Sequence, residues 1–403
     1  MNIWRPYFFI ITVWYICAGI PAFFNIMANK KKYVETIAVH GANNPVLGSD
    51  IIQPIHLSTT FERRSDGTLN DHVYTRISNP NRLTVENKIA ALEEATTAIA
   101  FASGLAAVNA LFENILEPGS HIIIPDDCYH GTRYLMDKFF SRWQVSFSET
   151  DMTVIENIER LIKPNTKLIW IETPSNPQLK IADIKAIVSL AAKHNITTAC
   201  DNTFATSILQ KPLQMGVDYV MHSSTKFFSG HSDILGGVVC TNLTNETANN
   251  IREYQAIAGA VPSPFDCWLL NRSLATFPLR LAAQCSNAAT IAAFLETHKG
   301  IEKVFYPGLT SHPNHDIAKQ QMTNGFGSII SILVKGDLQQ TLKVAGKLSI
   351  FKHATSLGGV ESLVEHRRTA EGKHPLSPEN LLRISIGIEN VEDLIEDFKT
   401  ALD

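Results

Sequence analysis

Between residues 98 and 242, short runs of β-branched and other apolar residues alternate with stretches whose apolar residues recur at helical spacing. Runs of this length are typical of buried strands, and their alternation with amphipathic helices predicts a mostly parallel sheet with helices on both faces. One of the predicted helices spans residues 181–194. The predicted strands are 121–125, 145–149, 167–172, 197–200, 218–222 and 236–240.

The rest of the chain predicts a second, smaller α/β domain. Residues 268–298 have the pattern of one long helix, which would connect the two domains. A strand at 328–334, a helix at 339–348, a strand at 381–388 and a helix at 391–402 would follow. Because 403 residues is long for a single core, we expect four segments: an extension at 1–32, an arm at 33–80, a large domain at 81–275 and a small domain at 276–403.

The N-terminal extension allows two interpretations. Residues 6–27 are almost continuously apolar, with Arg5 before them and three lysines at 30–32 after them. This stretch is long enough to span a bilayer and resembles an uncleaved signal-anchor. However, Met27 opens "MANKKKYVETIAVHGA", which looks like the start of a soluble protein, and we favour this second interpretation. Membrane contact is expected only if the apolar segment belongs to the native protein.

Charge and cysteine usage exclude some classes of protein. The formal net charge is −4 and 18% of the residues are charged, without long charge runs. A nucleic-acid partner is not expected, because such proteins carry a basic patch or a high pI. The six cysteines are scattered without a CxxC pair. They indicate reduced thiols in a cytoplasmic protein rather than a disulfide framework.

Polar clusters follow several predicted strands, where ligands of parallel sheets bind. Lys226, in "HSSTKFFSGHSD", follows the strand at 218–222. Desolvation in a cleft would make its amine a nucleophile towards aldehydes, although an isolated lysine is more often a surface residue. Asp201, in "CDNT", ends the preceding strand. It could pair with the pyridinium nitrogen of pyridoxal 5′-phosphate (PLP) or cap a helix.

A Ser-Gly turn in "FASGLAAVNAL" predicts an anion site at the start of a helix. The backbone N–H groups of Gly104 and Leu105 would point at a phosphate, and the hydroxyls of Ser223 and Thr225 could join them. An ordinary capped helix is the alternative. The GxxxxGK[ST] and GxGxxG patterns of nucleotide-binding sites are absent from the sequence.

Three further residues have both a functional and a structural interpretation. Tyr129 could stack on a flat cofactor or simply pack. Asn176 could donate to a cofactor oxygen or form a turn before Pro177. Arg383, a cation in an apolar strand, could bind a substrate carboxylate or form an internal ion pair with Glu361 or Glu389.

We expect no metal site. His222, His231 and Asp233 lie close together in the sequence, but neither an HExxH motif nor a cysteine pair accompanies them.

Seven ordered sequence blocks together resemble the Cys/Met-metabolism family of PLP enzymes, over residues 35–402. Blocks in this order and spacing are a specific signal, and only the N-terminal extension lies outside them. The blocks are "YTRISNPNR", "ASGLAA", "DDCYHGTR", "ETPSNP", "DNTFATSILQKPLQMGVDYVMHSSTKFFSGHSD", "SLGGVESLV" and "LLRISIGIEN".

The resemblance implies an aspartate-aminotransferase-like PLP fold of type I and a role for each site residue. Lys226 would form the covalent imine link with PLP, and Asp201 would pair with its ring nitrogen. Tyr129 would stack on the ring and Asn176 would contact its hydroxyl oxygen. The phosphate would be held by Gly104, Leu105, Ser223 and Thr225, and by Tyr74 and Arg76 of the arm of a neighbouring subunit, which implies a homotetramer built from dimers.

The resemblance also implies the chemistry. Arg383, assisted by Ser356, would clamp the α-carboxylate of a small amino-acid substrate. Lys226 would move the Cα proton, with Tyr129 as a candidate acid/base and Tyr74 tuning it.

Within the family, Glu361 favours cystathionine γ-synthase, an enzyme of methionine biosynthesis, or γ-lyase over β-lyase. Residues 364–381 depart from the usual family pattern, so the substrate stays open. A membrane-anchored relative without catalysis is the alternative from another class.

Overall fold

The computed structural model describes residues 32–41, 50–371 and 376–403. The described residues from 34 to 403 form one compact unit. The apolar segment at 6–27 therefore lies outside the described residues. Within the described residues, no helix combines the length and the apolar character that crossing a membrane requires.

A seven-stranded sheet forms the centre of the compact unit, in the order β1-β7-β6-β5-β4-β2-β3. Strands β3, β2, β4, β5 and β6 run parallel, whereas β7 runs antiparallel to both β6 and β1. The prediction of a mostly parallel sheet is thus confirmed, although the edge strand β1 was not predicted. The strands are β1 (Thr97–Phe101), β2 (His121–Pro125), β3 (Ser146–Thr150), β4 (Thr166–Glu172), β5 (Thr197–Asp201), β6 (Tyr219–His222) and β7 (Gly237–Thr241).

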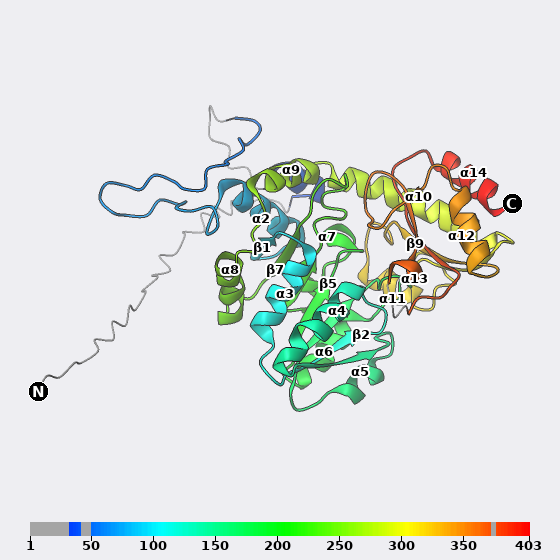
Figure 1. Cartoon of the computed structure of the whole chain (residues 1–403), viewed down its shortest axis with the longest axis horizontal. Coiled ribbons are helices and arrows are strands. Elements are labelled where there is room, and N and C mark those ends of the chain that lie inside the picture. Colours follow the sequence, from blue (N-terminus) through cyan, green and yellow to red (C-terminus); the bar gives the residue numbers. More distant parts are fainter. Residues whose placement is uncertain (1–31, 42–49, 372–375) are drawn as a thin grey trace, which may run out of the picture. The chain divides into compact units, whose positions relative to one another are not determined.

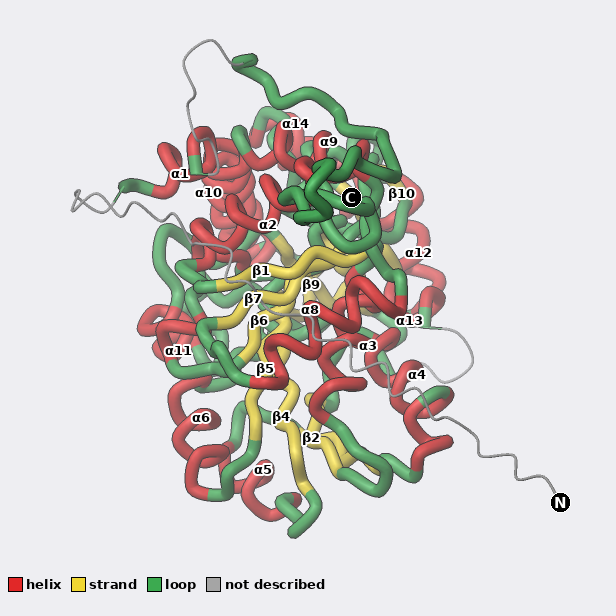
Figure 2. Tube along the Cα trace, turned by 90° about the vertical axis from the view of Figure 1, so that its left-hand side faces the viewer, coloured by secondary structure: helices red, strands yellow, loops and turns green. Residues whose placement is uncertain are grey.

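Helices cover both faces of this sheet (Figures 1 and 2). Alternate residues of the strands feed two separate apolar cores: Ile169 and Ile171 pack on one face, and Leu168 and Trp170 on the other. Short 3₁₀ turns lie at Phe140–Trp143 and Pro212–Met215. The helices are α1 (Val34–His40), α2 (Pro80–Glu93), α3 (Gly104–Ile115), α4 (His130–Lys138), α5 (Ile155–Leu161), α6 (Ile184–Lys193), α7 (Thr206–Leu209), α8 (Glu246–Ala258) and α9 (Pro264–Leu274).

A second sheet lies in the C-terminal part of the chain, in the order β10-β11-β12-β9-β8. Its core packs against helices on one side, as the orange and red region of Figure 1 shows. The strands are β8 (Ile301–Phe305), β9 (Ile329–Val334), β10 (Lys352–His353), β11 (Leu363–His366) and β12 (Leu381–Ser385), and the helices are α10 (Phe277–Thr297), α11 (His315–Gln321), α12 (Leu338–Lys347), α13 (Arg367–Ala370) and α14 (Val391–Leu402). Because both sheets belong to one compact unit, the domain boundary at 275/276 stays a prediction.

The prediction of one long helix at 268–298 was wrong. Helix α9 ends at Leu274 and α10 begins at Phe277, with Pro278 in its first turn. Proline lacks an N–H group and is favoured in the first turn of a helix, so its position marks a new start rather than a continuous helix. The two helices still connect the region of the first sheet to that of the second.

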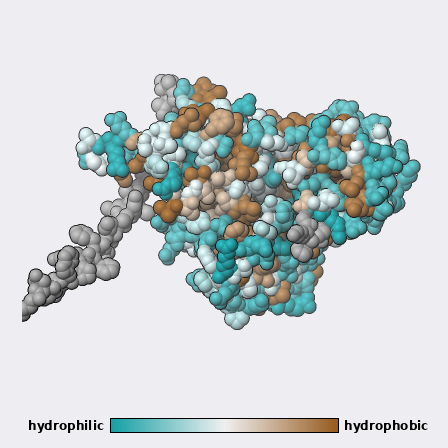
Figure 3. All heavy atoms as spheres, in the orientation of Figure 1, coloured by the Kyte–Doolittle hydropathy of each residue, from teal (hydrophilic) through white to brown (hydrophobic). Residues whose placement is uncertain are grey.

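The arm carries several apolar side chains on the surface. Ile51 is 96% exposed and Ile52 69% exposed, and other exposed apolar residues of the arm are Ile55, Leu57, Leu69, Tyr74 and Ile77. Figure 3 shows hydrophobic patches interspersed on a largely hydrophilic face of the molecule. Exposed apolar patches commonly mark contacts with another protein surface. This exposure suits the predicted contact of residues 33–80 with a neighbouring subunit, which stays a prediction.

Candidate functional site

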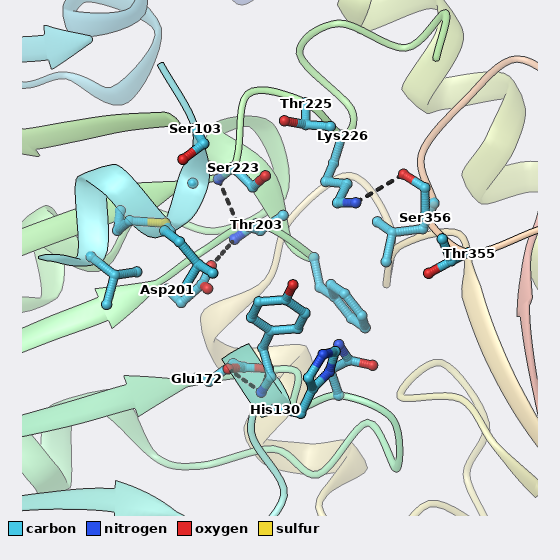
Figure 4. A pocket seen from close by; sticks show the side chains of 18 of the residues that line it. Ser103, His130, Glu172, Asp201, Thr203, Ser223, Thr225, Lys226, Thr355 and Ser356 are labelled. Carbon is cyan, nitrogen blue, oxygen red and sulfur yellow. Dashed lines mark hydrogen bonds between the residues drawn. The ribbon is translucent and has the colours of Figure 1, made fainter. Parts of the chain in front are cut away.

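A cavity of about 230 Å³ lies at the carboxyl ends of β4, β5 and β6, beside the start of α3 and the loop at 355–357. Figure 4 shows side chains from both halves of the chain converging on it. Ten of the predicted site residues line this cavity: Gly104, Leu105, Tyr129, Asn176, Asp201, Ser223, Thr225, Lys226, Ser356 and Arg383.

Lys226 enters the cavity from the loop after β6. Its Nζ donates a hydrogen bond to Ser356 Oγ at 2.8 Å (Figure 4). Burial, helped by the nearby charge of Arg383, lowers the pKa of Lys226 from 10.5 to about 8. The amine is therefore neutral, and nucleophilic, at a much lower pH than that of an exposed lysine.

This lowered pKa predicts how Lys226 reacts with an aldehyde such as that of PLP. Only the neutral amine attacks a carbonyl, so we expect the rate of covalent PLP attachment to the apoprotein to rise with pH and level off above about pH 8. Below that pH the rate should fall about tenfold per unit, as the amine becomes protonated. Stopped-flow absorbance over a pH series measures this, and a midpoint near 10.5 would contradict the buried position of Lys226.

Asp201 lies at the floor of the cavity, at the end of β5. It is 9% exposed, and its Oδ1 accepts a hydrogen bond from the backbone N–H of Thr203 at 3.0 Å. Burial raises the pKa of Asp201, and none of the described cations forms an ion pair with it. A buried carboxylate without a cation is costly, so this position favours a cationic group of a ligand.

The start of α3 forms a second polar wall of the cavity. Ser103 caps the helix by accepting from the N–H of Ala106 at 3.1 Å, so the N–H groups of Gly104 and Leu105 precede the first helical hydrogen bond. A Cβ on Gly104 would lie 3.0 Å from Ser223 Oγ. Glycine therefore keeps the space between this helix start and Ser223 open.

The hydroxyls on the other side of this space differ in availability. Ser223 Oγ has no hydrogen-bond partner among the described residues. In contrast, Thr225 Oγ1 donates to the carbonyl of Gly236 at 3.1 Å and accepts from its N–H at 2.9 Å. Of the two predicted phosphate-binding hydroxyls, only Ser223 is thus free to donate without a rearrangement.

Tyr129 stands at the N-terminus of α4, with its ring on the wall of the cavity. Its backbone N–H donates to both carboxylate oxygens of Glu172, at 3.1 and 2.9 Å. Burial raises the pKa of Tyr129, while the charges of Arg367 and Arg383 act to lower it. Glu172 thus fixes the backbone that presents the phenol.

Arg383 lies on β12, directly opposite Glu365 on β11. Its Nη2 donates to Glu365 Oε2 at 2.5 Å and to the carbonyl of Ser356 at 3.1 Å, and its Nη1 donates to Asn176 Oδ1 at 3.0 Å. The expected structural partners of Arg383, Glu361 or Glu389, were therefore wrong. Antiparallel register places Glu365 nearer, because residues paired across two strands face the same side.

Ser356 lies in a loop that contacts both Lys226, through its Oγ, and Arg383, through its backbone carbonyl. Its backbone has φ of 97°, a conformation that is strained for a residue with a Cβ. Gly358, with φ of 78°, lies so close to the loop of Lys226 that a Cβ would be 2.8 Å from the N of Phe227. The loop thus brings Ser356 against Lys226 at the expense of local strain.

Three predicted site residues do not line this cavity. Arg76 donates instead to the carbonyl of Ala256, at 2.5 Å, and its guanidinium lies 5.6 Å from the ring centre of Tyr74. The role of Tyr74 and Arg76 in the site of a neighbouring subunit stays a prediction. Glu361 accepts a hydrogen bond from Ser232, a surface residue near the loop of Lys226.

The histidines near Lys226 have other partners. His222 Nε2 lies 2.9 Å from Glu93 Oε2 in the interior, and His231 Nδ1 lies 2.7 Å from the carbonyl of Ser229. Among the residues that the structure describes, no three histidines, cysteines or acidic residues are placed to hold a metal ion.

Among the polar residues that line the cavity, sequence reasoning missed His130, Glu172, Thr203, Thr355 and Arg367. Three of them belong to conspicuous sequence blocks, and their closeness to Tyr129 or Asp201 was a usable signal. Arg367 lies in residues 364–381, the segment that departs from the family pattern. Nothing in the local sequence indicates that it faces the cavity.

These donors and acceptors fit PLP. An unpaired buried carboxylate at Asp201 suits the protonated ring nitrogen, and the start of α3 with Ser223 suits the phosphate. Lys226 offers a neutral amine for the aldehyde, and the amide nitrogen of Asn176 can donate to the ring oxygen while its Oδ1 accepts from Arg383. The cavity therefore contains a partner for each polar group of PLP.

Comparison with known proteins agrees with this arrangement. The family model for Cys/Met metabolism PLP-dependent enzymes matches residues 35–403. Cystathionine γ-synthase of Mycobacterium tuberculosis is 41% identical over 374 residues, which are 91% of this chain and 96% of that protein. Cystathionine β-lyase of Coxiella burnetii is 39% identical over 384 residues, covering 93% and 99%.

Solved structures extend the similarity to the fold. Cystathionine γ-lyase from Lactobacillus plantarum, solved in complex with L-serine, superposes with a TM-score of 0.87 at 37% identity, covering 92% of this chain and 98% of that one. This similarity confirms the expected type I PLP fold. With the family match over residues 35–403, it shows that the chain belongs to the Cys/Met-metabolism family of PLP-dependent transsulfuration enzymes.

Proposed function

We propose that the protein is a cystathionine γ-synthase, which replaces the acyloxy group of an O-acylhomoserine with the sulfur of cysteine, giving cystathionine and the free carboxylate of the acyl group. Glu361, a half-buried carboxylate held by Ser232 on the loop next to Lys226, supports a γ-synthase or a γ-lyase over a β-lyase. A carboxylate there can bind the amino group of the incoming cysteine. Similarity to the γ-synthase of Mycobacterium tuberculosis is matched by that to the β-lyase of Coxiella burnetii, so the assays below decide between synthase and lyase.

PLP, when bound, supplies an electron sink for the charge that develops at Cα of the substrate. The residues of this chain hold the substrate and move its protons. Arg383 binds the α-carboxylate, with its guanidinium fixed by Glu365, Asn176 and the carbonyl of Ser356. The amine of Lys226, when not bound to PLP, would remove the Cα proton.

Ser356 keeps the freed amine of Lys226 in place, because its Oγ is 2.8 Å from Nζ. Tyr129 acts as a second acid/base near the departing and incoming groups. Burial raises the pKa of Tyr129, and the charges of Arg367 and Arg383 oppose that rise. The phenol therefore enters the reaction protonated and can donate its proton to the departing group. Asp201, opposite Lys226, balances the positive charge of the ring nitrogen.

We further propose a cytoplasmic homotetramer in which Tyr74 and Arg76 complete the site of a neighbouring subunit. The exposed apolar residues of the arm support a subunit contact. Five cysteines within the described residues are buried and free of disulfides, which supports a reducing compartment.

Two assays test the proposed reaction. Purified holoenzyme is given O-succinylhomoserine or O-acetylhomoserine, each with and without cysteine, and cystathionine is measured by mass spectrometry. In parallel it is given cystathionine alone. We expect cystathionine to form from an acyl ester and cysteine at a rate above that of cystathionine cleavage.

Faster cleavage of cystathionine alone would overturn the synthase proposal. The products would then identify the activity, since γ-cleavage releases cysteine and β-cleavage releases homocysteine. Glu361→Gln, with Glu379→Gln as a surface control, should raise KM for cysteine about tenfold, because a charge-assisted hydrogen bond is lost.

A further inference from the structure

Arg367, the first residue of α13, is a second guanidinium on the wall of the cavity. It is 3% exposed, and Nη1 donates to Glu365 Oε2 at 2.9 Å. This is the single hydrogen bond of its side chain among the described residues. Neither the fold nor the roles derived above make use of its remaining donors.

The unused donors of Arg367 form one edge of its planar fork. Nε is buried and has no partner within the described part of the chain, and neither has Nη2. In arginine, Nε and Nη2 point the same way and match the two oxygens of a carboxylate. An unmade hydrogen bond of a buried charged group costs more free energy than one of a buried neutral group. The pattern of used and unused donors is therefore that of an incomplete anion site.

The charges around Arg367 also indicate an anion site. Glu365 Oε2 accepts from both Arg367 and Arg383, so two guanidiniums share one carboxylate. Both arginines are buried, at 3% and 4% exposure. A net positive charge in such a place is costly unless a ligand neutralises it.

Two other titratable groups face Arg367 without neutralising it. Burial, together with Arg367, lowers the pKa of His130, which therefore remains neutral near pH 7. The Glu371 carboxylate is near but accepts from the backbone of Leu376 and from Ser377. It makes no ion pair with Arg367 among the described residues.

We propose that Arg367 is a second carboxylate-binding arginine of this site, acting beside Arg383 on the amino-acid ligand. The inference rests on the proposed function only in taking amino acids as ligands. The carboxylate bound by Arg367 is either the α-carboxylate, shared with Arg383, or a carboxylate on the side chain. In both cases the bound group is a carboxylate of the ligand. The two arginines and Glu365 together carry one net positive charge, which a single ligand carboxylate neutralises.

Calorimetric titration of the PLP-loaded enzyme tests this proposal without any turnover measurement. The probes are L-alanine with one carboxylate, L-glutamate with two, and L-alaninamide with none. In Arg367→Gln we expect Kd to rise about 10- to 100-fold for glutamate and alanine, because a charge-assisted hydrogen-bond pair is lost. Kd for alaninamide should stay within about twofold, because this probe has no carboxylate to bind.

The pattern across probes identifies the carboxylate. Similar losses for alanine and glutamate assign the α-carboxylate, whereas a loss confined to glutamate assigns the side-chain carboxylate. Unchanged Kd values for both acids would overturn the proposal, as would an equal loss for alaninamide, which would indicate a merely structural role.

Matched variants keep this result interpretable. Arg368→Gln removes the neighbouring arginine, which donates to the carbonyl of Ser377 at 3.0 Å outside the cavity, and should leave all three Kd values unchanged. Arg367→Lys keeps the charge but loses the fork, so its losses should be intermediate. If Arg367→Gln does not fold, this lysine variant decides alone, and unchanged acid affinities in it overturn the bidentate site. Because none of the probes can undergo γ-replacement, failure of the synthase assay does not affect this test.

Discussion

Replacing Lys226 with alanine is expected to remove the covalent attachment of PLP and to lower turnover by about 10³-fold or more. The variant loses both the amine that binds the aldehyde and the base that moves the Cα proton. The cavity itself should survive, because Lys226 makes one side-chain hydrogen bond, to Ser356. The visible absorbance that a bound and protonated PLP imine gives should be present in the wild type and absent from the variant.

Controls separate this loss from unfolding. Lys319→Ala changes an exposed lysine on α11 and should keep both the absorbance and the turnover. Thermal denaturation of Lys226→Ala should show a transition similar to that of the apo wild type. A wild-type protein that stays colourless after incubation with PLP would refute the assignment of Lys226, and so would a visible band that persists in Lys226→Ala.

Arg383→Ala is expected to lower kcat/KM for amino-acid substrates by about 10²- to 10³-fold, mainly through KM. The guanidinium is buried on β12 and lies near the amine of Lys226, where the α-carboxylate must sit. The affinity for PLP should change far less. Glu365 keeps its ion pair with Arg367 in this variant, so the fold should remain.

Steady-state kinetics and PLP titration of the same preparations measure the two effects. Arg383→Lys should also bind substrate poorly, because an ammonium cannot replace the forked contact or the bonds to Asn176 and Ser356. Arg142→Ala, on the surface near Phe139, is a control that should retain wild-type kinetics. If Arg383→Ala instead loosened PLP more than it raised KM, the carboxylate clamp would have been assigned to the wrong residue.

Local sequence was enough to predict the parallel sheet, and ten of the predicted site residues line the cavity. Lys226 and Asp201 follow buried strands, and the carboxyl ends of parallel strands meet at one edge of a sheet. Position after a strand therefore placed these side chains at one edge of the sheet, whereas their predicted roles rested on the family resemblance. The Ser-Gly turn before Gly104 likewise predicted a capped helix start, which Ser103 provides.

Local sequence failed where a contact depends on pairing between distant segments. The partner of Arg383 is Glu365 because of the register between β11 and β12. Distance along the chain gave no preference among Glu361, Glu365 and Glu389. The break between α9 and α10 was missed because both helices are apolar on one face, and the position of Pro278 was outweighed by that periodicity.

The sequence by itself determined the family and the type of cofactor, because these depend on residue types at fixed positions after strands and at helix starts. Only the tertiary structure decided how the groups act on one another. The lowered pKa of Lys226 requires its burial, and the shared position of Arg367 and Arg383 on Glu365 requires the second sheet to fold. Burial and through-space charge interactions depend on how distant segments pack, so they cannot be predicted from the order of residues along the chain.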